Sequence, residues 1–169
     1  EGAAAADEVE RLLRAMDPRD RVLALISGGG SAMLPAPAKG MTLADKQAVN
    51  GLLLASGADI SQVNLIRQGL SRLKGGGWLR LSAAPVAALI LSDVPGDDLR
   101  VIASGPTVAP VGTRAEAAAL ARRLGIWERM PKAAQAALLR ADDPAPLPQA
   151  RNILVGSNAI SVAAMVAVG

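Results

Sequence analysis

Three short apolar runs, each ending in a loop of glycine or small polar residues, constrain the fold of this chain more than any other feature. The runs cover residues 21–26, 86–91 and 152–155. Unbroken apolar runs of this length are typical of parallel strands that are buried on both faces. Helical patterns separate the runs, and this alternation predicts an α/β fold: a Rossmann-like, three-layer α/β/α arrangement around a mostly parallel sheet.

The segments between the runs carry apolar residues at helical spacing. They predict helices over residues 2–16, 43–56, 60–70, 113–124 and 131–140, and a final helix after Gly156-Ser157-Asn158. Thr42 and Asp45 resemble a capping box, with Asp where Glu or Gln is usual. Residues 74–77, Lys-Gly-Gly-Gly, are expected to be irregular backbone. A doubly wound sheet has about five or six strands, so three strands predict an incomplete sheet.

Composition excludes several classes of site and partner. The chain has no cysteine and no histidine, which excludes disulfides, thiolate nucleophiles, histidine zinc sites and Ser-His-Asp schemes. A net charge of only +3 and the absence of Tyr and Phe argue against nucleic acid as a partner. No apolar run approaches the roughly 18 residues that cross a bilayer, and residues 1–16 have the pattern of an amphipathic helix instead of a signal segment. We therefore expect a cytoplasmic protein that does not bind membranes.

Small polar loops follow all three runs, at residues 27–31, 92–98 and 156–158. In open α/β sheets such loops gather at the carboxyl ends of the strands, where ligands bind. The first loop is Ser27, Gly28, Gly29, Gly30 and Ser31. Its glycines let backbone N–H groups approach a phosphate or carboxylate, and its serines add donors. It is neither a Walker loop nor a G-x-G-x-x-G fingerprint, and a tight turn explains the same residues equally well.

Aspartates occupy the second loop. Asp93, Asp97 and Asp98 follow the run 86–91. Their chemistry suits Mg²⁺ coordination beside nucleotide phosphates, although solvation of a loop is the commoner reason for such aspartates. Asp93 lies closest to the strand end and is the best single candidate for a metal ligand or a catalytic carboxylate, followed by Asp97.

Basic residues end the helix predicted over residues 60–70. Arg67 shares a helix face with Ser71, and Lys74 lies beside three glycines, from where it would reach a phosphate or a carboxylate. Solvated charges at a helix end are an equally good explanation. Residues 104–107, Ser-Gly-Pro-Thr, form a further small loop, for which the residues alone favour a plain turn.

Four segments in order along the chain resemble the amino-terminal, DUF4147-type domain of the glycerate 2-kinase family that occurs beside the MOFRL domain. The segments are SGGGSAMLPAP, GMTLADKQAVNGLLLASGADISQVNLIRQGLSRLKGG, LILSDVPGDD and IASGPTV. Many members of that family are named hydroxypyruvate reductase. The resemblance is close over residues 17–108 and looser over residues 112–169.

The resemblance implies phosphorylation of D-glycerate at its 2-hydroxyl by ATP, with Mg²⁺, in a cleft between two α/β domains. It gives the catalytic roles to Asp93, Asp97, Lys74 and Arg67, with Asp93 and Asp97 as metal ligands. It gives nucleotide binding to the loop at residues 27–31 and to Ser104, Gly105 and Thr107. Asn158, in the loop that follows the third run, is a further candidate for nucleotide binding because of its place at the strand end. Residues 1–169 would then be part of the amino-terminal domain, without the family's preceding glycine-lysine segment and its MOFRL domain. A homodimer stays open.

The chain departs from the family pattern at three places. The usual R-K-H-L-S reads R-Q-G-L-S at residues 67–71, G-G-R-L-A reads G-G-W-L-R at residues 76–80, and P-D-P reads A-P-V at residues 109–111. With these departures and the segments that lie outside the chain, we expect the isolated chain to be inactive.

Two other functions compete with a kinase. The name hydroxypyruvate reductase suggests an NAD(P)H-dependent oxidoreductase, which predicts a dinucleotide fingerprint followed by an acidic residue for the ribose. Neither is present in the sequence. A non-catalytic domain, truncated or engineered, is the third candidate, and the absence of Phe, Tyr and His favours it.

Overall fold

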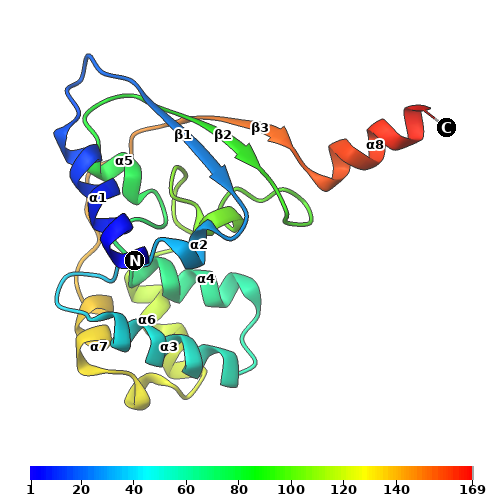
Figure 1. Ribbon diagram of the computed structural model, residues 1–169. Helices are drawn as coiled ribbons and strands as arrows, with labels where there is room; N and C mark the ends of the chain where they lie inside the picture. Colours follow the sequence, from blue (N-terminus) through cyan, green and yellow to red (C-terminus); the bar gives the residue numbers. More distant parts are fainter. Residues whose placement is uncertain (169) are drawn as a thin grey trace.

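A three-stranded parallel sheet organises the molecule, and the predicted α/β class is confirmed. The computed structural model describes residues 1–168. Its strands are β1 (Val22–Ser27), β2 (Val86–Leu91) and β3 (Arg151–Gly156), in the order β1-β2-β3 (Figure 1). The register places Val22 opposite Val86 and Ala88 opposite Asn152, so all three strands end at the same edge of the sheet.

The helices occupy the segments that the periodicity predicts. They are α1 (Gly2–Ala15), α2 (Gly30–Met33), α3 (Leu43–Ala55), α4 (Ile60–Gly69), α5 (Gly77–Leu81), α6 (Arg114–Arg123), α7 (Lys132–Leu138) and α8 (Asn158–Val168), with the 3₁₀ turns η1 (Ile102–Ser104) and η2 (Trp127–Arg129). The sequence did not predict α2 and α5. They are single turns, too short to show a helical period. Each begins directly after a glycine with a left-handed backbone conformation, within a glycine-rich segment that is typical of a loop.

Capping boxes fix the starts of α3, α4 and α6. Thr42 accepts a hydrogen bond from the Asp45 amide at 3.1 Å, and the Asp45 carboxylate accepts one from the Thr42 amide at 2.8 Å. The predicted box is therefore confirmed, with Asp in the place of Glu. The same arrangement begins α4 and α6. Each box pairs amides at the start of the helix that have no partner within it.

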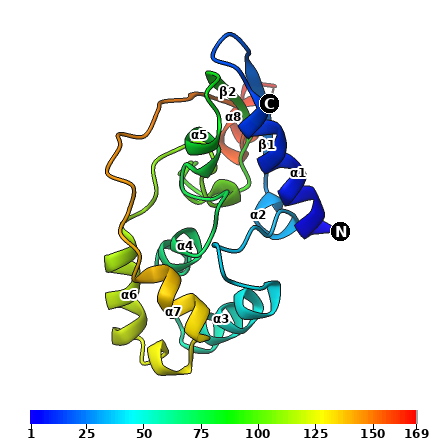
Figure 2. The same ribbon diagram turned by 90° about the vertical axis from the view of Figure 1, so that its left-hand side faces the viewer.

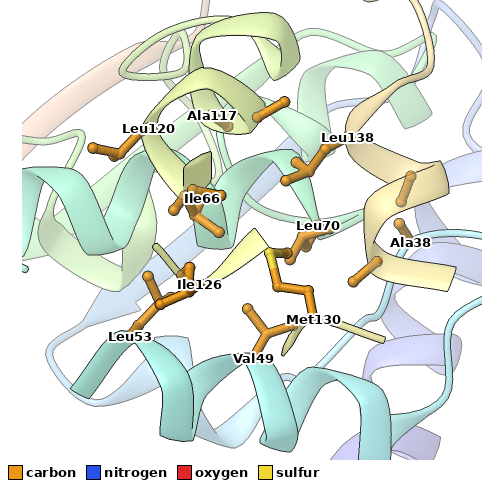
Figure 3. Close-up of a cluster of buried hydrophobic side chains, with 14 of the residues drawn as sticks. Ala38, Val49, Leu53, Ile66, Leu70, Ala117, Leu120, Ile126, Met130 and Leu138 are labelled. Atoms are coloured by element: carbon orange, nitrogen blue, oxygen red, sulfur yellow. The ribbon is translucent and has the colours of Figure 1, made fainter. Parts of the chain in front are cut away.

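A helical body of α3, α4, α6 and α7 packs beside the sheet and carries the largest apolar core (Figures 1 and 2). Figure 3 shows side chains from these helices converging, among them Leu53 of α3, Ile66 of α4, Leu120 of α6 and Leu138 of α7. This packing fixes the position of α4, whose last turn carries Arg67. The helical body therefore determines where that guanidinium lies.

The sheet is buried on one face and open on the other. Ala24, Ile26 and Ala88 pack against α5 and η1, whereas Leu23 and Leu25 are 64% and 75% exposed. The prediction that the first apolar run is buried on both faces is therefore wrong for residues 1–168. An apolar run signals that its side chains avoid water, but it does not say which element covers them.

The last helix, α8, projects away from the sheet (Figure 1), and several of its apolar side chains are exposed, including Ile160 and Met165. None of the helices within residues 1–168 combines the length and the apolar character that crossing a bilayer requires.

Candidate functional site

The loops at the carboxyl ends of the strands meet. The Asp93 side chain lies directly over Gly28, so that a Cβ at residue 28 would overlap the carboxylate. The Ser92 amide donates to the Gly156 carbonyl at 2.9 Å. Glycine at position 28 therefore lets the second loop approach the first, and all three strand ends are linked, as the parallel topology predicts.

Two cations converge on one neutral hydroxyl in the glycine loop. The Lys74 Nζ donates to the Ser31 carbonyl at 2.9 Å and to the Ser31 Oγ at 2.5 Å. The Arg67 Nη2 donates to the same Oγ at 3.0 Å. Within residues 1–168, neither cation forms an ion pair with a carboxylate. The guanidinium of Arg67 and the ammonium of Lys74 thus both donate to an oxygen that carries no charge.

Behind Ser31, a hydrogen-bond chain runs into the protein. The Ser31 and Ser104 hydroxyl oxygens are 2.9 Å apart, and the Ser104 hydroxyl donates to the Asn64 Oδ1 at 3.0 Å. A hydroxyl has one proton, so Ser31 must donate to Ser104, which leaves its lone pairs for the two cations. We call Ser31, Asn64, Arg67, Lys74 and Ser104 the Ser31 cluster.

The backbone at Ser104 is strained. Ala103 and Ser104 have φ values of 49° and 61°, in the left-handed region that residues with a side chain rarely adopt. Such a conformation costs on the order of 1–3 kcal/mol per residue and persists only where the surroundings hold it. Here the Ser104 carbonyl accepts hydrogen bonds from the Gly75 amide at 3.0 Å and from the Gln68 side chain at 3.1 Å. These bonds aim the Ser104 hydroxyl at Ser31.

The glycines after Lys74 hold the two small loops together. Residues 74–76 form a turn, as predicted, whereas Gly77 already begins α5; Gly75 and Gly76 have φ values of 54° and 78°. The Gly76 amide donates to the Gly105 carbonyl at 2.8 Å, and the Trp78 amide donates to the Pro106 carbonyl at 3.2 Å. Lys74 is therefore carried on a segment that is pinned to the Ser104 loop.

Positive charge accumulates at this position. Lys74 is only 5% exposed, and its burial, together with the nearby charges of Arg67 and Lys46, lowers its pKa to about 7. Burial and the charge of Arg67 also lower the pKa of Lys46, and burial lowers that of Arg67. Lys46, on α3, thus belongs electrostatically to the Ser31 cluster.

The sequence analysis missed Lys46 and Asn64. Both lie on predicted helices, Lys46 directly after the capping box of α3 and Asn64 in the middle of α4, where their residue types are ordinary. Asn64 is linked to Ser31 through the Ser104 hydroxyl, and the charge of Lys46 acts on Lys74, only because of how the helices pack in the folded chain. No sequence pattern in a single chain reveals these links.

A cavity of about 190 Å³ adjoins the cluster. The Lys74 side chain and Gly30 line it together with apolar groups of Met33, Trp78 and Ala103. Within residues 1–168, the lining is therefore mostly apolar, with Lys74 as its one charged side chain.

The predicted aspartates lie in the adjoining loop. Asp93 is exposed and forms no ion pair within residues 1–168, Asp97 has a left-handed φ of 54°, and Asp98 pairs with Arg100 at 2.8 Å. In the described part of the chain, no group of three or more carboxylates is arranged to hold a metal ion. Any metal held here would therefore need oxygen ligands from another source.

Other predicted nucleotide-binding residues lie outside the Ser31 cluster. The Thr107 hydroxyl donates to Asn152 of β3 at 2.7 Å, and Gly105 gives its carbonyl to Gly76. Asn158 is exposed at the first turn of α8, and no side-chain hydrogen bond joins it to the cluster within residues 1–168. Ser27 is exposed beside the cluster at the end of β1, where it lines the cavity.

Comparison with known proteins relates the chain to one family. A family model described as a domain of unknown function (DUF4147) matches residues 1–139. A glycerate kinase of Bos taurus is 43% identical over 164 residues, which cover 94% of this chain and 31% of the relative. An Agrobacterium vitis protein that bears the provisional name hydroxypyruvate reductase is 49% identical over 140 residues, which cover 82% of this chain and 32% of that protein.

Two solved structures share the fold. The PH0495 protein of Pyrococcus horikoshii has a TM-score of 0.89 and 35% identity, over 97% of this chain and 39% of that one. A glycerate kinase of Thermotoga maritima has a TM-score of 0.81 and 33% identity, over 92% of this chain and 36% of that one. The chain thus spans about a third of the length of the relatives that it matches.

Proposed function

The chain belongs to the DUF4147 family, and on that premise we propose that it forms part of the amino-terminal domain of an ATP-dependent kinase that phosphorylates D-glycerate at its 2-hydroxyl. Relatives from Bos taurus and Thermotoga maritima are named glycerate kinase. The family name itself carries no activity, so the proposal depends on these names and on the chemistry of the Ser31 cluster.

One observation carries the proposal: Arg67 and Lys74 both donate to the uncharged Ser31 hydroxyl. Burying cations without a counter-ion is unfavourable, so a site of this kind is stabilised when an anion enters. A phosphate oxygen accepts strong hydrogen bonds from both a guanidinium and an ammonium. ATP and D-glycerate are both anions, which fits an active site that lies at this end of the sheet.

In this proposal the cluster contributes mainly by positioning the reactants and neutralising charge. Phosphoryl transfer needs the attacking hydroxyl in line with the leaving oxygen and positive charge around the transferred group. Arg67 and Lys74 would supply the charge, and the hydrogen bonds of Ser31 to Ser104 would keep the glycine loop in place. The chain has no histidine, so Asp93 or Asp97 is our candidate to accept the proton of the glycerate hydroxyl.

Mg²⁺ fits the aspartate loop if phosphate oxygens and water supply the ligands that the two aspartates do not. Mg²⁺ at a nucleotide is held by one or two carboxylates, with phosphate oxygens and water as the remaining ligands. Asp93 and Asp97 provide that number of carboxylates, and Asp93 lies over Gly28 of the glycine loop. Bound there, the ion would neutralise phosphate charge, and the two aspartates would orient it.

An oxidoreductase is the second candidate, because the relative from Agrobacterium vitis carries the name hydroxypyruvate reductase. Binding of NAD(P)H at a strand end uses a glycine fingerprint and an acidic residue for the ribose. The chain has neither, which favours the kinase. Protection of the folded chain by NADH, without protection by ATP, would reverse this preference.

Calorimetric titration of Mg-ATP into the chain, with and without D-glycerate, tests the proposal. We expect Mg-ATP to bind, and we expect Lys74→Met and Arg67→Met each to weaken binding about 10-fold or more, because each removes a charge-assisted hydrogen bond. Lys39→Met and Arg123→Met, at exposed positions outside the cluster, serve as matched controls and should bind like the parent. Equal affinity in all five proteins would contradict the assignment.

A further inference from the structure

A second cavity lies apart from the strand ends, and we call it the basic cavity. It has a volume of about 580 Å³, within the range that is typical of small-molecule sites, and residues of α1, α4, α5, α6 and α7 line it. In the described part of the chain, the strand-end loops at residues 27–31, 92–98 and 156–158 contribute nothing to this lining. Of the Ser31 cluster, only Lys74 reaches it, so a ligand here would occupy a different place.

The lining of the basic cavity carries an excess of positive charge. Besides Lys74, its basic side chains are Arg14, Lys39, Arg72, Arg80, Arg114 and Arg140. Arg14 and Arg72 are paired with carboxylates of α1. Lys39 and Arg140 form no ion pair within residues 1–168. The Arg140 Nη2 lies 3.6 Å from where a Cβ on Gly40 would be, next to Lys39 in the chain. Uncompensated cations in a concave surface favour an anion as the ligand.

Two arginines from different helices hold the segment at residues 141–146, which we call the strap. Arg80 of α5 pairs with Asp143 at 3.1 Å. The Arg114 Nη1 of α6 lies 3.6 Å from an Asp142 carboxylate oxygen and donates to the carbonyl that precedes Asp142 at 3.0 Å. Figure 2 shows the chain here running from α7 in the helical body to the sheet. The strap thus presents two adjacent carboxylates to the two arginines.

We propose that the basic cavity binds a small polycarboxylate, whose carboxylates replace those of the strap on Arg80 and Arg114. The strap aspartates stand in for two carboxylates of one ligand, and a guanidinium matches a planar carboxylate through two parallel hydrogen bonds. Further negative charge on the ligand would face Lys39 and Arg140. The site goes beyond the proposed kinase chemistry, because neither Arg67 nor the glycine loop contributes to it.

The strap is held weakly enough to be exchanged. The side chains of Arg80 and Asp143 are 33% and 52% exposed, and those of Arg114 and Asp142 are 31% and 45% exposed. Partly exposed ion pairs of this kind contribute little to stability. All six residues of the strap are exposed, so its displacement uncovers little apolar area. A ligand with two or more carboxylates would meet the same arginines and, in addition, the cations that the strap leaves unpaired.

Calorimetric titration of citrate, without Mg²⁺ and at 0.15 M ionic strength, tests the site. We expect citrate to bind the parent chain and acetate, a monocarboxylate, not to bind measurably. Arg80→Met should weaken citrate binding about 10-fold and Arg140→Met about 3-fold, because Arg80 faces a carboxylate directly and Arg140 is exposed. Arg123→Met, at an exposed position outside the lining, is the matched control and should bind citrate like the parent.

Neutralising the strap tests the exchange. Asp142→Asn combined with Asp143→Asn removes the competing charges and preserves the shape of both side chains, so citrate should bind about 5-fold more tightly or better. Asp17→Asn combined with Asp20→Asn makes the same change of net charge in the exposed loop before β1. At this ionic strength distant charges are screened, so the control pair should change citrate affinity less than about 2-fold.

The remaining outcomes decide against the proposal or a part of it. Absence of citrate binding, or unchanged affinity in Arg80→Met, would overturn the site. Equal tightening by the two pairs of Asn variants would show that net charge alone acts, and would reject the exchange with the strap. Pyrophosphate binding as tight as that of citrate would reject the preference for carboxylates. Mg-ATP should bind Arg80→Met like the parent, so a failure of the proposed kinase and a failure of this site give different results.

Discussion

At the scale of the residue, Lys74 is the most informative side chain in the molecule. It is buried on a segment that the hydrogen bonds of Gly75 and Gly76 hold to the Ser104 loop. Its ammonium donates to the Ser31 hydroxyl, and burial and the charges of Arg67 and Lys46 lower its pKa. Burial and charge act in the same direction on it, which makes its protonation sensitive to whatever enters the site. The lowered pKa of Lys74 should therefore affect the free energy of unfolding even when no ligand is bound.

The pH dependence of stability tests this. The unfolded chain holds the Lys74 proton up to about pH 10.4, whereas the folded chain releases it near pH 7, so the free energy of unfolding should rise with pH in between. The slope is at most about 1.4 kcal/mol per pH unit. Lys46, whose pKa is also lowered, adds in the same direction. Urea unfolding between pH 6.5 and 9.5 measures it.

Lys74→Met should flatten most of that slope, and Lys39→Met should preserve it. The chain has no histidine, cysteine or tyrosine, so few other side chains titrate in this range. If the free energy of unfolding of the parent protein stays level or falls from pH 7 to 9, Lys74 does not have a lowered pKa in the folded state.

At the scale of the element, local signals predicted most of the helices, and tertiary contacts decided the rest. The capping boxes of α3, α4 and α6 lie within four residues of sequence, so a single chain reveals them. The link from Asn64 through Ser104 to Ser31, and the effect of the Lys46 charge on Lys74, depend on helix packing, and that information is spread over distant segments. The sequence identified the glycine loop, Arg67 and Lys74 as candidate anion-binding groups. It did not reveal that Arg67 and Lys74 both contact the Ser31 hydroxyl of that loop.

Two helical glycines offer a matched test of packing. In α4, a Cβ at Gly69 would lie 2.8 Å from the Leu138 Cδ2 of α7, so Gly69→Ala should destabilise the chain by about 1–3 kcal/mol. In α3, a Cβ at Gly51 would meet nothing, so Gly51→Ala should stabilise the chain by about 0.5–1 kcal/mol through the helix propensity of alanine. Urea unfolding of both variants is the measurement. Stabilisation by Gly69→Ala, as large as that by Gly51→Ala, would show that α4 and α7 are not in close contact.

At the scale of the whole molecule, one face of the sheet carries exposed apolar side chains. Leu23, Leu25 and Leu91 are all more than half exposed on it, and Val155 of β3 continues the same apolar surface. The sequence predicted that this face is covered because a run of apolar residues favours burial. Such a run does not identify the element that covers it. The structure shows which face of the sheet residues 1–168 cover and which face they leave exposed.

Polar substitution on that face should separate solubility from stability. Leu25 is 75% exposed, so Leu25→Thr removes little buried area and should change the free energy of unfolding by less than about 0.5 kcal/mol. Fluorescence of a bound hydrophobic dye should fall in the variant. By contrast, Ala88→Thr, at a fully buried position of the opposite face, should destabilise by about 1–3 kcal/mol. Dye binding unchanged by Leu25→Thr would argue against an open face.

The parallel register of β1, β2 and β3 also has a kinetic consequence. Neighbouring strands are joined only through residues 28–85 and 92–150, so each pairing must close a long loop before it gains any hydrogen bonds. Only the hydrogen bonds within each helix are local, because the contacts of α4 with α6 and of α3 with α7 also join distant segments. Single helices should therefore form early during refolding, and the strands should align late, which delays the formation of the Ser31 cluster until the chain has almost completed its folding.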